Sequence, residues 1–177
     1  MRTPRAAGFI ASFKVTPLEI FRVNKGPSIF LREWAAFPPQ RFTIFDLHTY
    51  EGKVLPKALN KATYQLPNGA SMRPNGRYQQ ALVRRLAGRD WIVYSIPKDT
   101  PLPEELILVH EHTDHYSMQP AIEMSLEDLN QQVTQFLQTN GTLYTTEHWL
   151  STYKLPSWST KKAYGSRSVM DNNTFIG

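Results

Sequence analysis

Five ionisable side chains occupy six consecutive positions directly after an apolar run of the chain. The run at residues 106–109 is followed by His110, Glu111, His112, Asp114 and His115. Polar groups next to a hydrophobic core are costly unless they have a partner or a function. Two chemistries could use this cluster, a metal centre or a cofactor pocket.

A metal centre would draw on His110 and His112, because alternation along a strand places both on one face. His115 or Asp114 could then supply a third ligand. The spacing differs from the helical HExxH motif, and we expect no metal. A hydrolase would instead combine Ser71, His115 and Asp114, but no nucleophile elbow surrounds the serine. The adjacent His and Asp side chains would also diverge on a strand.

Two other features favour an anionic ligand. The segment LPNGASMRPNG, residues 66–76, combines glycines, Ser71 and Arg73 in a turn-rich loop of the kind that holds phosphate. Arg22 lies among apolar and β-favouring residues in a predicted strand. A guanidinium in that position needs an anionic partner, and Glu19 would face the opposite side. Either an internal carboxylate or a ligand phosphate could satisfy Arg22.

Charge is divided unevenly along the 177 residues, whose net charge is +5. Residues 1–89 carry 15 Lys and Arg against 4 Asp and Glu, whereas residues 90–147 carry 1 against 10. The basic half could attract phosphate or nucleic acid, or could simply pack against the acidic half. The chain has no cysteine, which excludes disulfides and thiolate chemistry. No apolar run is long enough to cross a bilayer, and we expect no membrane partner.

The pattern of elements predicts a single α+β domain with short strands and flanking helices. We expect strands near residues 17–24, 91–96, 106–110 and 115–118, and a further strand after residue 142. A helix is predicted over residues 77–87, with Tyr78, Leu82 and Leu86 on one face. The clearest helix begins after Ser125 and buries an apolar face formed by Leu126, Leu129, Val133, Phe136 and Leu137.

Three segments in a fixed order resemble a known family. They are FRV at 21–23, GASMRPNG at 69–76, and DHYSMQPAIEM at 114–124 followed by a helix. The set resembles the ADP-ribosyltransferase-like toxins delivered by type VI secretion, of the Tse-two type, and their fungal homologues. The resemblance covers residues 18–139 and implies a mixed core of short strands. We therefore expect a domain at 18–150, with a basic extension at 1–17 and a second extension at 151–177.

The resemblance also implies roles for individual residues. Arg22 would hold NAD, the substrate, near its nicotinamide ribose and phosphates, and Ser71 would support the pocket. The essential histidine of the family corresponds to His115, with Tyr116 beside it. We expect Ser71 and His115 to be catalytic, and Arg22, Ser71, Arg73 and Tyr116 to bind NAD.

The sequence does not identify a catalytic carboxylate. Related transferases place a glutamate in an ExE motif, which this chain lacks. Glu111 or Glu123 could serve, or His115 could organise the cleft without a carboxylate.

The expected function is transfer of ADP-ribose to a macromolecular target, or hydrolysis of NAD. A non-catalytic binding module and an RNA-directed phosphotransferase are the alternatives. An immunity-type protein is a candidate neutralising partner, and nucleic acid is a weaker one. We expect a cytoplasmic location, although the basic start of the chain also permits a mitochondrial one.

Overall fold

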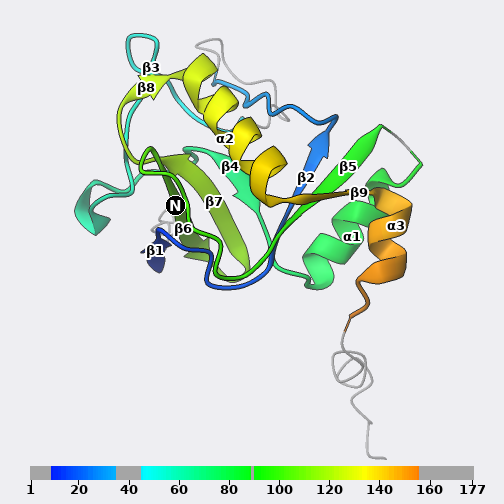
Figure 1. Ribbon diagram of the computed structural model, residues 1–177. Coiled ribbons are helices and arrows are strands. Elements are labelled where there is room, and N and C mark those ends of the chain that lie inside the picture. The colour runs from blue at the N-terminus through cyan, green and yellow to red at the C-terminus, as the bar shows by residue number, and fades with distance from the viewer. Residues whose placement is uncertain (1–8, 35–44, 89, 156–177) are drawn as a thin grey trace, which may run out of the picture.

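The computed structural model describes residues 9–34, 45–88 and 90–155. These residues form one α+β domain, as the sequence predicts, built from three small sheets and three α-helices (Figure 1). Every pair of neighbouring strands in the sheets is antiparallel. The distal part of the expected C-terminal extension, residues 156–177, lies outside the described residues.

The largest sheet has four strands in the order β1-β6-β7-β4. Their bounds are β1 Ala11–Phe13, β6 Leu106–His112, β7 His115–Pro120 and β4 Ala70–Met72. Strands β6 and β7 form a hairpin whose register shifts between His110 and His112. The turn passes through Thr113, which has a φ of 47°. This hairpin carries the whole ionisable cluster.

The second sheet has three strands in the order β2-β5-β9. They are β2 Ile20–Lys25, β5 Trp91–Ile96 and β9 Thr142–Thr145. A two-stranded sheet pairs β3 Lys53–Val54 with β8 Met124–Ser125. The predicted strand at 91–96 is confirmed residue for residue, and β2 begins three residues later than expected because Pro17 and Leu18 precede the paired segment.

The two larger sheets meet where β2 runs past the end of β4. The Phe21 amide donates to the Arg73 carbonyl at 2.8 Å, and the Arg73 amide donates to the Phe21 carbonyl at 3.0 Å. This pair of bonds continues the antiparallel pattern from one sheet to the other. It fixes Arg22 and Ser71 close together although they lie far apart in sequence.

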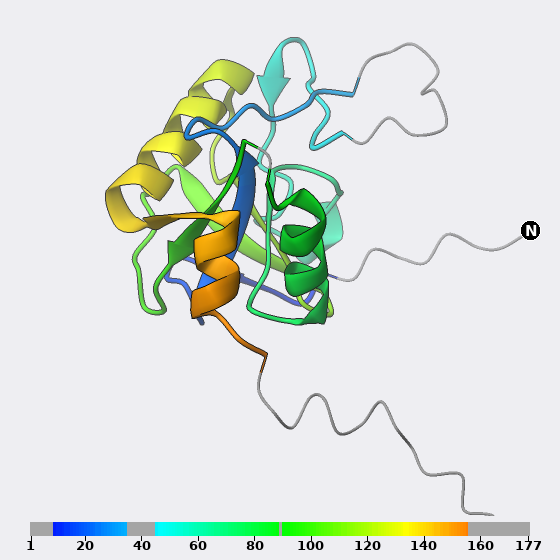
Figure 2. The same cartoon turned by 90° about the vertical axis from the view of Figure 1, so that its right-hand side faces the viewer.

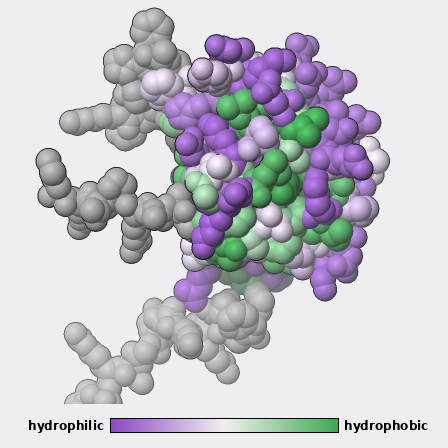
Figure 3. Space-filling model, turned by 90° about the vertical axis from the view of Figure 1, so that its left-hand side faces the viewer, coloured by the Kyte–Doolittle hydropathy of each residue, from purple (hydrophilic) through white to green (hydrophobic). Residues whose placement is uncertain are grey.

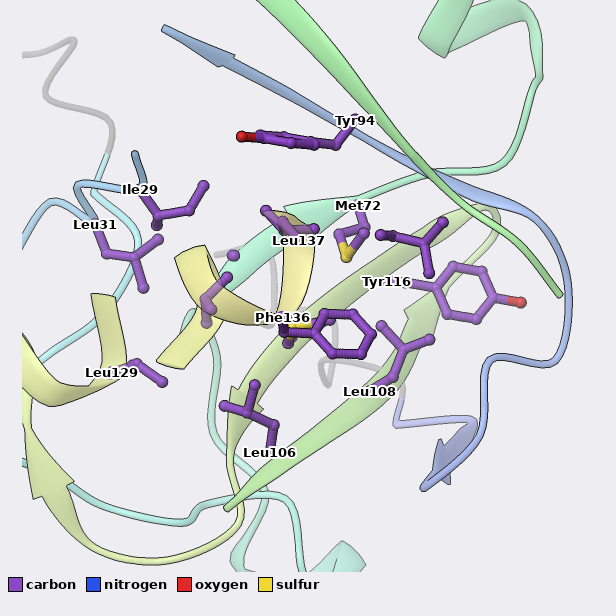
Figure 4. Close-up of a cluster of buried hydrophobic side chains, with 14 of the residues drawn as sticks. Ile29, Leu31, Met72, Tyr94, Leu106, Leu108, Tyr116, Leu129, Phe136 and Leu137 are labelled. Atoms are coloured by element: carbon purple, nitrogen blue, oxygen red, sulfur yellow. The ribbon is translucent and has the colours of Figure 1, made fainter. Parts of the chain in front are cut away.

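Helix α2, Leu126–Asn140, covers the inner face of the two sheets (Figure 1). The Ser125 hydroxyl caps its start by accepting from the Asp128 amide at 3.0 Å. Figure 4 shows the helix residues facing the strands across the main core. The buried helix side chains are Leu129, Val133, Phe136 and Leu137, and the strand residues include Met72, Leu106, Leu108 and Tyr116.

Helices α1, Arg77–Leu86, and α3, Thr146–Thr152, lie side by side on the other face of the second sheet (Figures 1 and 2). A second core cluster joins them to that sheet through Phe21, Val83, Val93 and Trp149. The prediction of which face of α1 is buried is wrong. Gln79, Gln80 and Val83 are buried, whereas Tyr78 is exposed.

The face of α1 differs in part because Gln80 has hydrogen-bond partners in the interior. Gln80 donates through Nε2 to Asn75 Oδ1 at 2.8 Å and to the Tyr153 carbonyl at 2.7 Å. Hydrogen-bonded side chains tolerate burial that an unpartnered amide would not. Helix α3 was not predicted by the sequence; it supplies Trp149 and is followed by Tyr153, whose carbonyl accepts one of these bonds.

A third, smaller cluster lies under the chain that precedes β4. Its buried members are Ala58, Ile107, Val109 and Ala121. On the side of the molecule that lies to the left in Figure 1, apolar side chains gather in the middle and hydrophilic ones surround them (Figure 3). None of the helices in the described ranges is long and apolar enough to span a bilayer.

The expected N-terminal and C-terminal extensions contribute regular elements where they are described. Strand β1, within the expected extension at residues 1–17, pairs with β6, and α3 continues to Thr152. The proposed division into a domain and two extensions remains a prediction.

The second core cluster supplies the first prediction. Replacing the fully buried Trp149 by alanine should lower the free energy of unfolding by about 3–5 kcal/mol, because a large cavity would open between α3 and β2. Ser151→Ala, on the exposed side of the same helix, should change it by less than about 1 kcal/mol. Urea denaturation of both variants measures the difference, and equal stabilities would contradict this packing.

Candidate functional site

Arg22 reaches from β2 to the edge of β4. Its Nη1 donates to the Ser71 carbonyl at 2.9 Å. Its Nε is buried and has no hydrogen-bond partner among the described residues. Burial lowers the pKa of Arg22, while the negative charge of Asp46 opposes that change and the positive charge of Arg32 adds to it. The guanidinium is therefore a desolvated cation with unused hydrogen-bonding capacity.

A surface cavity of about 360 Å³ opens beside this guanidinium. Arg22, Lys25 and Arg32 are the cations in its lining, and Phe30 and Trp91 are its aromatic residues. Arg32 is neutralised by Asp46, which accepts from Arg32 Nε at 2.9 Å and from Nη2 at 3.1 Å. Among the lining residues, Arg22 and Lys25 are left to offset a bound negative charge.

A larger hollow, of about 480 Å³, runs along the outside of α2. Its lining consists only of neutral residues, among them Ser28, Phe30, Asn130 and Thr134. It offers an anion no counter-charge. The cavity at Arg22 therefore fits a phosphate-bearing ligand better than this hollow does.

Ser71 and His115 are brought together across the paired strands β4 and β7. The Ser71 Oγ lies 3.1 Å from His115 Nε2, although 44 residues separate the two in sequence. On the other side of the imidazole, His115 Nδ1 lies 2.6 Å from Glu111 Oε2. Nδ1 faces the carboxylate in a close contact outside hydrogen-bond geometry, and Nε2 is the ring nitrogen that faces the serine hydroxyl.

Glu111 is a buried carboxylate, only 2% exposed. Its Oε1 accepts from Ser117 Oγ at 2.8 Å and from Gln119 Nε2 at 3.1 Å. Burial raises its pKa, but the closeness of His115 and of the hydroxyl groups of Ser117 and Tyr64 outweighs that and lowers it. Burial and the negative charge of Glu111 in turn raise the pKa of Tyr64. Glu111 is thus held as an anion beneath His115.

The remaining histidines separate onto opposite faces of the hairpin. His110 stacks on Tyr116 with ring centroids 4.2 Å apart, and His112 stacks on His115 at 5.0 Å. The expectation that His110 and His112 share a face is wrong, because the register shift between them turns the second histidine over. Within the described ranges, no group of three or more His, Asp or Glu side chains could hold a metal ion.

Arg73 is anchored within the protein. Its guanidinium pairs with Asp114 Oδ1 at 2.5 Å and stands 4.0 Å above the ring of Tyr78. Asp114 therefore faces Arg73 rather than His115, as expected from the divergence of neighbouring side chains. Any role of Arg73 toward a ligand would have to share its charge with Asp114.

Tyr116 faces the main core, 5% exposed, on the side of the sheet opposite to His115 (Figure 4). Burial raises its pKa. Of the expected site residues, the structure brings Arg22, Ser71 and His115 together and adds Glu111, but it does not bring Tyr116 to them. Glu123 is exposed beyond Pro120, the far end of β7, which itself lies about 17 Å along the strand from His115.

Sequence reasoning missed Lys25, Arg32 and Asp46 in the cavity lining. Nothing in their local pattern marks them, since no recognisable motif surrounds Asp46. The role of Glu111 had a signal. With His110 paired to Tyr116, alternation along both strands places Glu111 and His115 on one face.

Residues 18–149 match the family model described as Tse2 ADP-ribosyltransferase toxin. The chain belongs to this toxin family. No curated protein matches the chain at a significant level. The family match spans β2, β4, the β6–β7 hairpin and α2, which are the elements that carry the site.

The buried carboxylate gives a prediction for this toxin-family protein. The pKa of Glu111 lies below its ordinary value of 4.5 in the folded state. The ionised group therefore stabilises the fold fully at pH values above the ordinary pKa. This contribution is lost as the pH falls through the lower pKa of the folded state. Glu111→Gln should lower the free energy of unfolding at pH 7 by about 1–3 kcal/mol and flatten its decline under acidic conditions.

Urea titrations at pH 7 and at acidic pH measure both effects. The exposed Glu123→Gln is the matched control and should behave as the unsubstituted protein. An acid dependence equally steep in the Glu111→Gln protein would contradict the ionised, stabilising state of this carboxylate.

Proposed function

We propose that this protein binds NAD and either transfers its ADP-ribose to a macromolecular target or hydrolyses it. The family supports transferase activity. The observation that carries the finer proposal is the desolvated Arg22, which lines the cavity and whose Nε lacks a described partner. Its Nη1 donates to the carbonyl of Ser71, the serine that contacts His115. A dinucleotide brings the phosphate charges that such a cation needs.

In this proposal the cavity receives the phosphate-bearing part of NAD. Arg22 offsets the charge of the phosphates, and Lys25 at the rim adds a second cation. Phe30 and Trp91 offer apolar surface to the rest of the ligand. A contribution from Arg73 to phosphate binding, and one from Tyr116, remain predictions.

The reaction breaks the N-glycosidic bond between nicotinamide and its ribose. Positive charge develops on the ribose as the bond breaks, so nearby negative charge lowers the barrier. Glu111 is buried behind His115 and acts on the site through the imidazole. We propose that Ser71 and His115 are the residues that contact the reacting ribose, with His115 oriented by Glu111.

The protein acts on a partner that the site does not identify. As a member of a toxin family it is proposed to meet its target in the cytoplasm, where NAD is available, and to be neutralised there by an immunity-type protein. Both are proposals that follow from the family and not from a contact of this chain.

The test of NAD binding uses Arg22. Arg22→Ala should weaken NAD binding about 10- to 100-fold, because one charge-assisted contact to phosphate is lost. Arg85→Ala, an exposed arginine on α1, is the matched control and should bind as the unsubstituted protein. Titration calorimetry measures binding, and circular dichroism verifies that each variant is folded.

Activity is read from NAD consumption and from growth arrest on expression. Both should be lost in Arg22→Ala and in His115→Ala. Toxicity unaltered in both variants would refute the assignment. Crystals soaked with NAD should show density between Arg22, Ser71 and His115.

A non-catalytic binding module is the competing function. It predicts no NAD consumption by the purified protein and capture of a partner that survives His115→Ala. An enzyme differs in that the unsubstituted protein consumes NAD and His115→Ala abolishes that consumption.

A further inference from the structure

The chain Ser71–His115–Glu111 has the connectivity of a serine nucleophile, its base and the acid that orients the base. Three consecutive contacts define it: Oγ to Nε2 at 3.1 Å, Nδ1 to Oε2 at 2.6 Å, and the donors that hold the carboxylate from behind. The roles in such a triad follow from geometry rather than from sequence order or fold. Here the acid is Glu111 and not Asp114.

Burial strengthens the inner link of this chain. The Glu111 side chain is 3% exposed and the His115 side chain 15%, so the contact between them is shielded from water. Ser71, by contrast, is exposed and its hydroxyl can be approached from solvent. A carboxylate that is fixed and ionised keeps the proton on Nδ1 and leaves Nε2 free to take one from Ser71.

Arg22 adds a fixed positive charge next to the nucleophile. Its Nη1 is bonded to the carbonyl of Ser71 itself, which also holds the serine backbone in place. A cation at this position favours the negative charge that develops when the hydroxyl attacks an electrophile.

We propose that Ser71 is a covalent nucleophile and that this site accepts acyl groups from carboxylic esters. This acyl-transfer activity needs no NAD and is separate from the function proposed above. The Ser71 Oγ attacks the ester carbonyl carbon while its proton passes to His115 Nε2. The alcohol leaves with that proton. Water then gives a proton to His115 and its hydroxide cleaves the acyl–Ser71 ester, after which His115 returns the proton to Ser71.

A fluorophosphonate probe tests the nucleophile directly. The serine oxygen attacks phosphorus, fluoride leaves, and a stable adduct remains on the protein. Intact mass spectrometry should show one adduct per chain, and peptide mapping should place it on Ser71. Ser71→Ala should remove it, and labelling of the unsubstituted protein no faster than that of Ser71→Ala would overturn the proposal.

The other two residues are tested by labelling rate. His115→Ala should slow labelling about 1,000-fold, because the base that accepts the serine proton is removed. Glu111→Gln should slow it about 100-fold or more, because the imidazole is no longer held in the tautomer that can accept that proton. Glu123→Gln and Ser151→Ala are matched controls and should label at the rate of the unsubstituted protein. Folded Glu111→Gln protein that labels at the same rate would show that the carboxylate has no part in activation.

A second measurement covers the case in which Glu111→Gln does not fold. Because the chain has no cysteine, Ser71→Cys introduces a single thiol. Its alkylation by iodoacetamide at pH 7 should be about 10-fold faster than that of Ser151→Cys, since His115 favours the thiolate. Equal alkylation rates at these two exposed positions would overturn activation by His115. Hydrolysis of p-nitrophenyl acetate, lost in Ser71→Ala, completes the test of acyl transfer.

Discussion

The mutual backbone hydrogen bonds between Phe21 and Arg73 are the constraint on which the site depends. They join β2 to the end of β4 and so hold the two larger sheets together. Arg22 and Ser71 lie close to these bonds in the sequence. The bonds fix the positions of β2 and β4, and the strands in turn set the directions of the two side chains. The helices serve the same junction from both sides, since α2 packs against one face and the pair α1 and α3 packs against Phe21 on the other.

Glu111 and Arg22, two charged side chains near this junction, differ in how completely their hydrogen-bonding groups are satisfied. Glu111 is surrounded by donors that hold it as an anion. Arg22 donates one hydrogen bond to a carbonyl oxygen and retains a buried nitrogen with no described partner. A charge fully satisfied inside the protein positions its neighbours, whereas one left incompletely satisfied is suited to a ligand. This asymmetry is why we assign Glu111 to orientation and Arg22 to binding.

The fold class and most elements could be predicted because their signals are local. Residues 91–96 are β-branched and aromatic, and Ser125 with the apolar face after it marks α2. The face of α1 could not be predicted, since burial of Gln79 and Gln80 depends on neighbours from other elements. Helix α3 was missed because its short segment follows a strand without a break and owes its place to Trp149 in the second core cluster.

The sequence by itself determined the family, the α+β class and the identities of Arg22, Ser71 and His115, because these rest on local patterns in a fixed order. Only the tertiary structure decided which of them meet and which carboxylate stands behind the histidine. The sequence left Glu111 and Glu123 open, and the hairpin register places Glu111 beside His115 while Asp114 pairs with Arg73. The same register turns Tyr116 into the core, because neighbouring side chains on a strand face opposite ways.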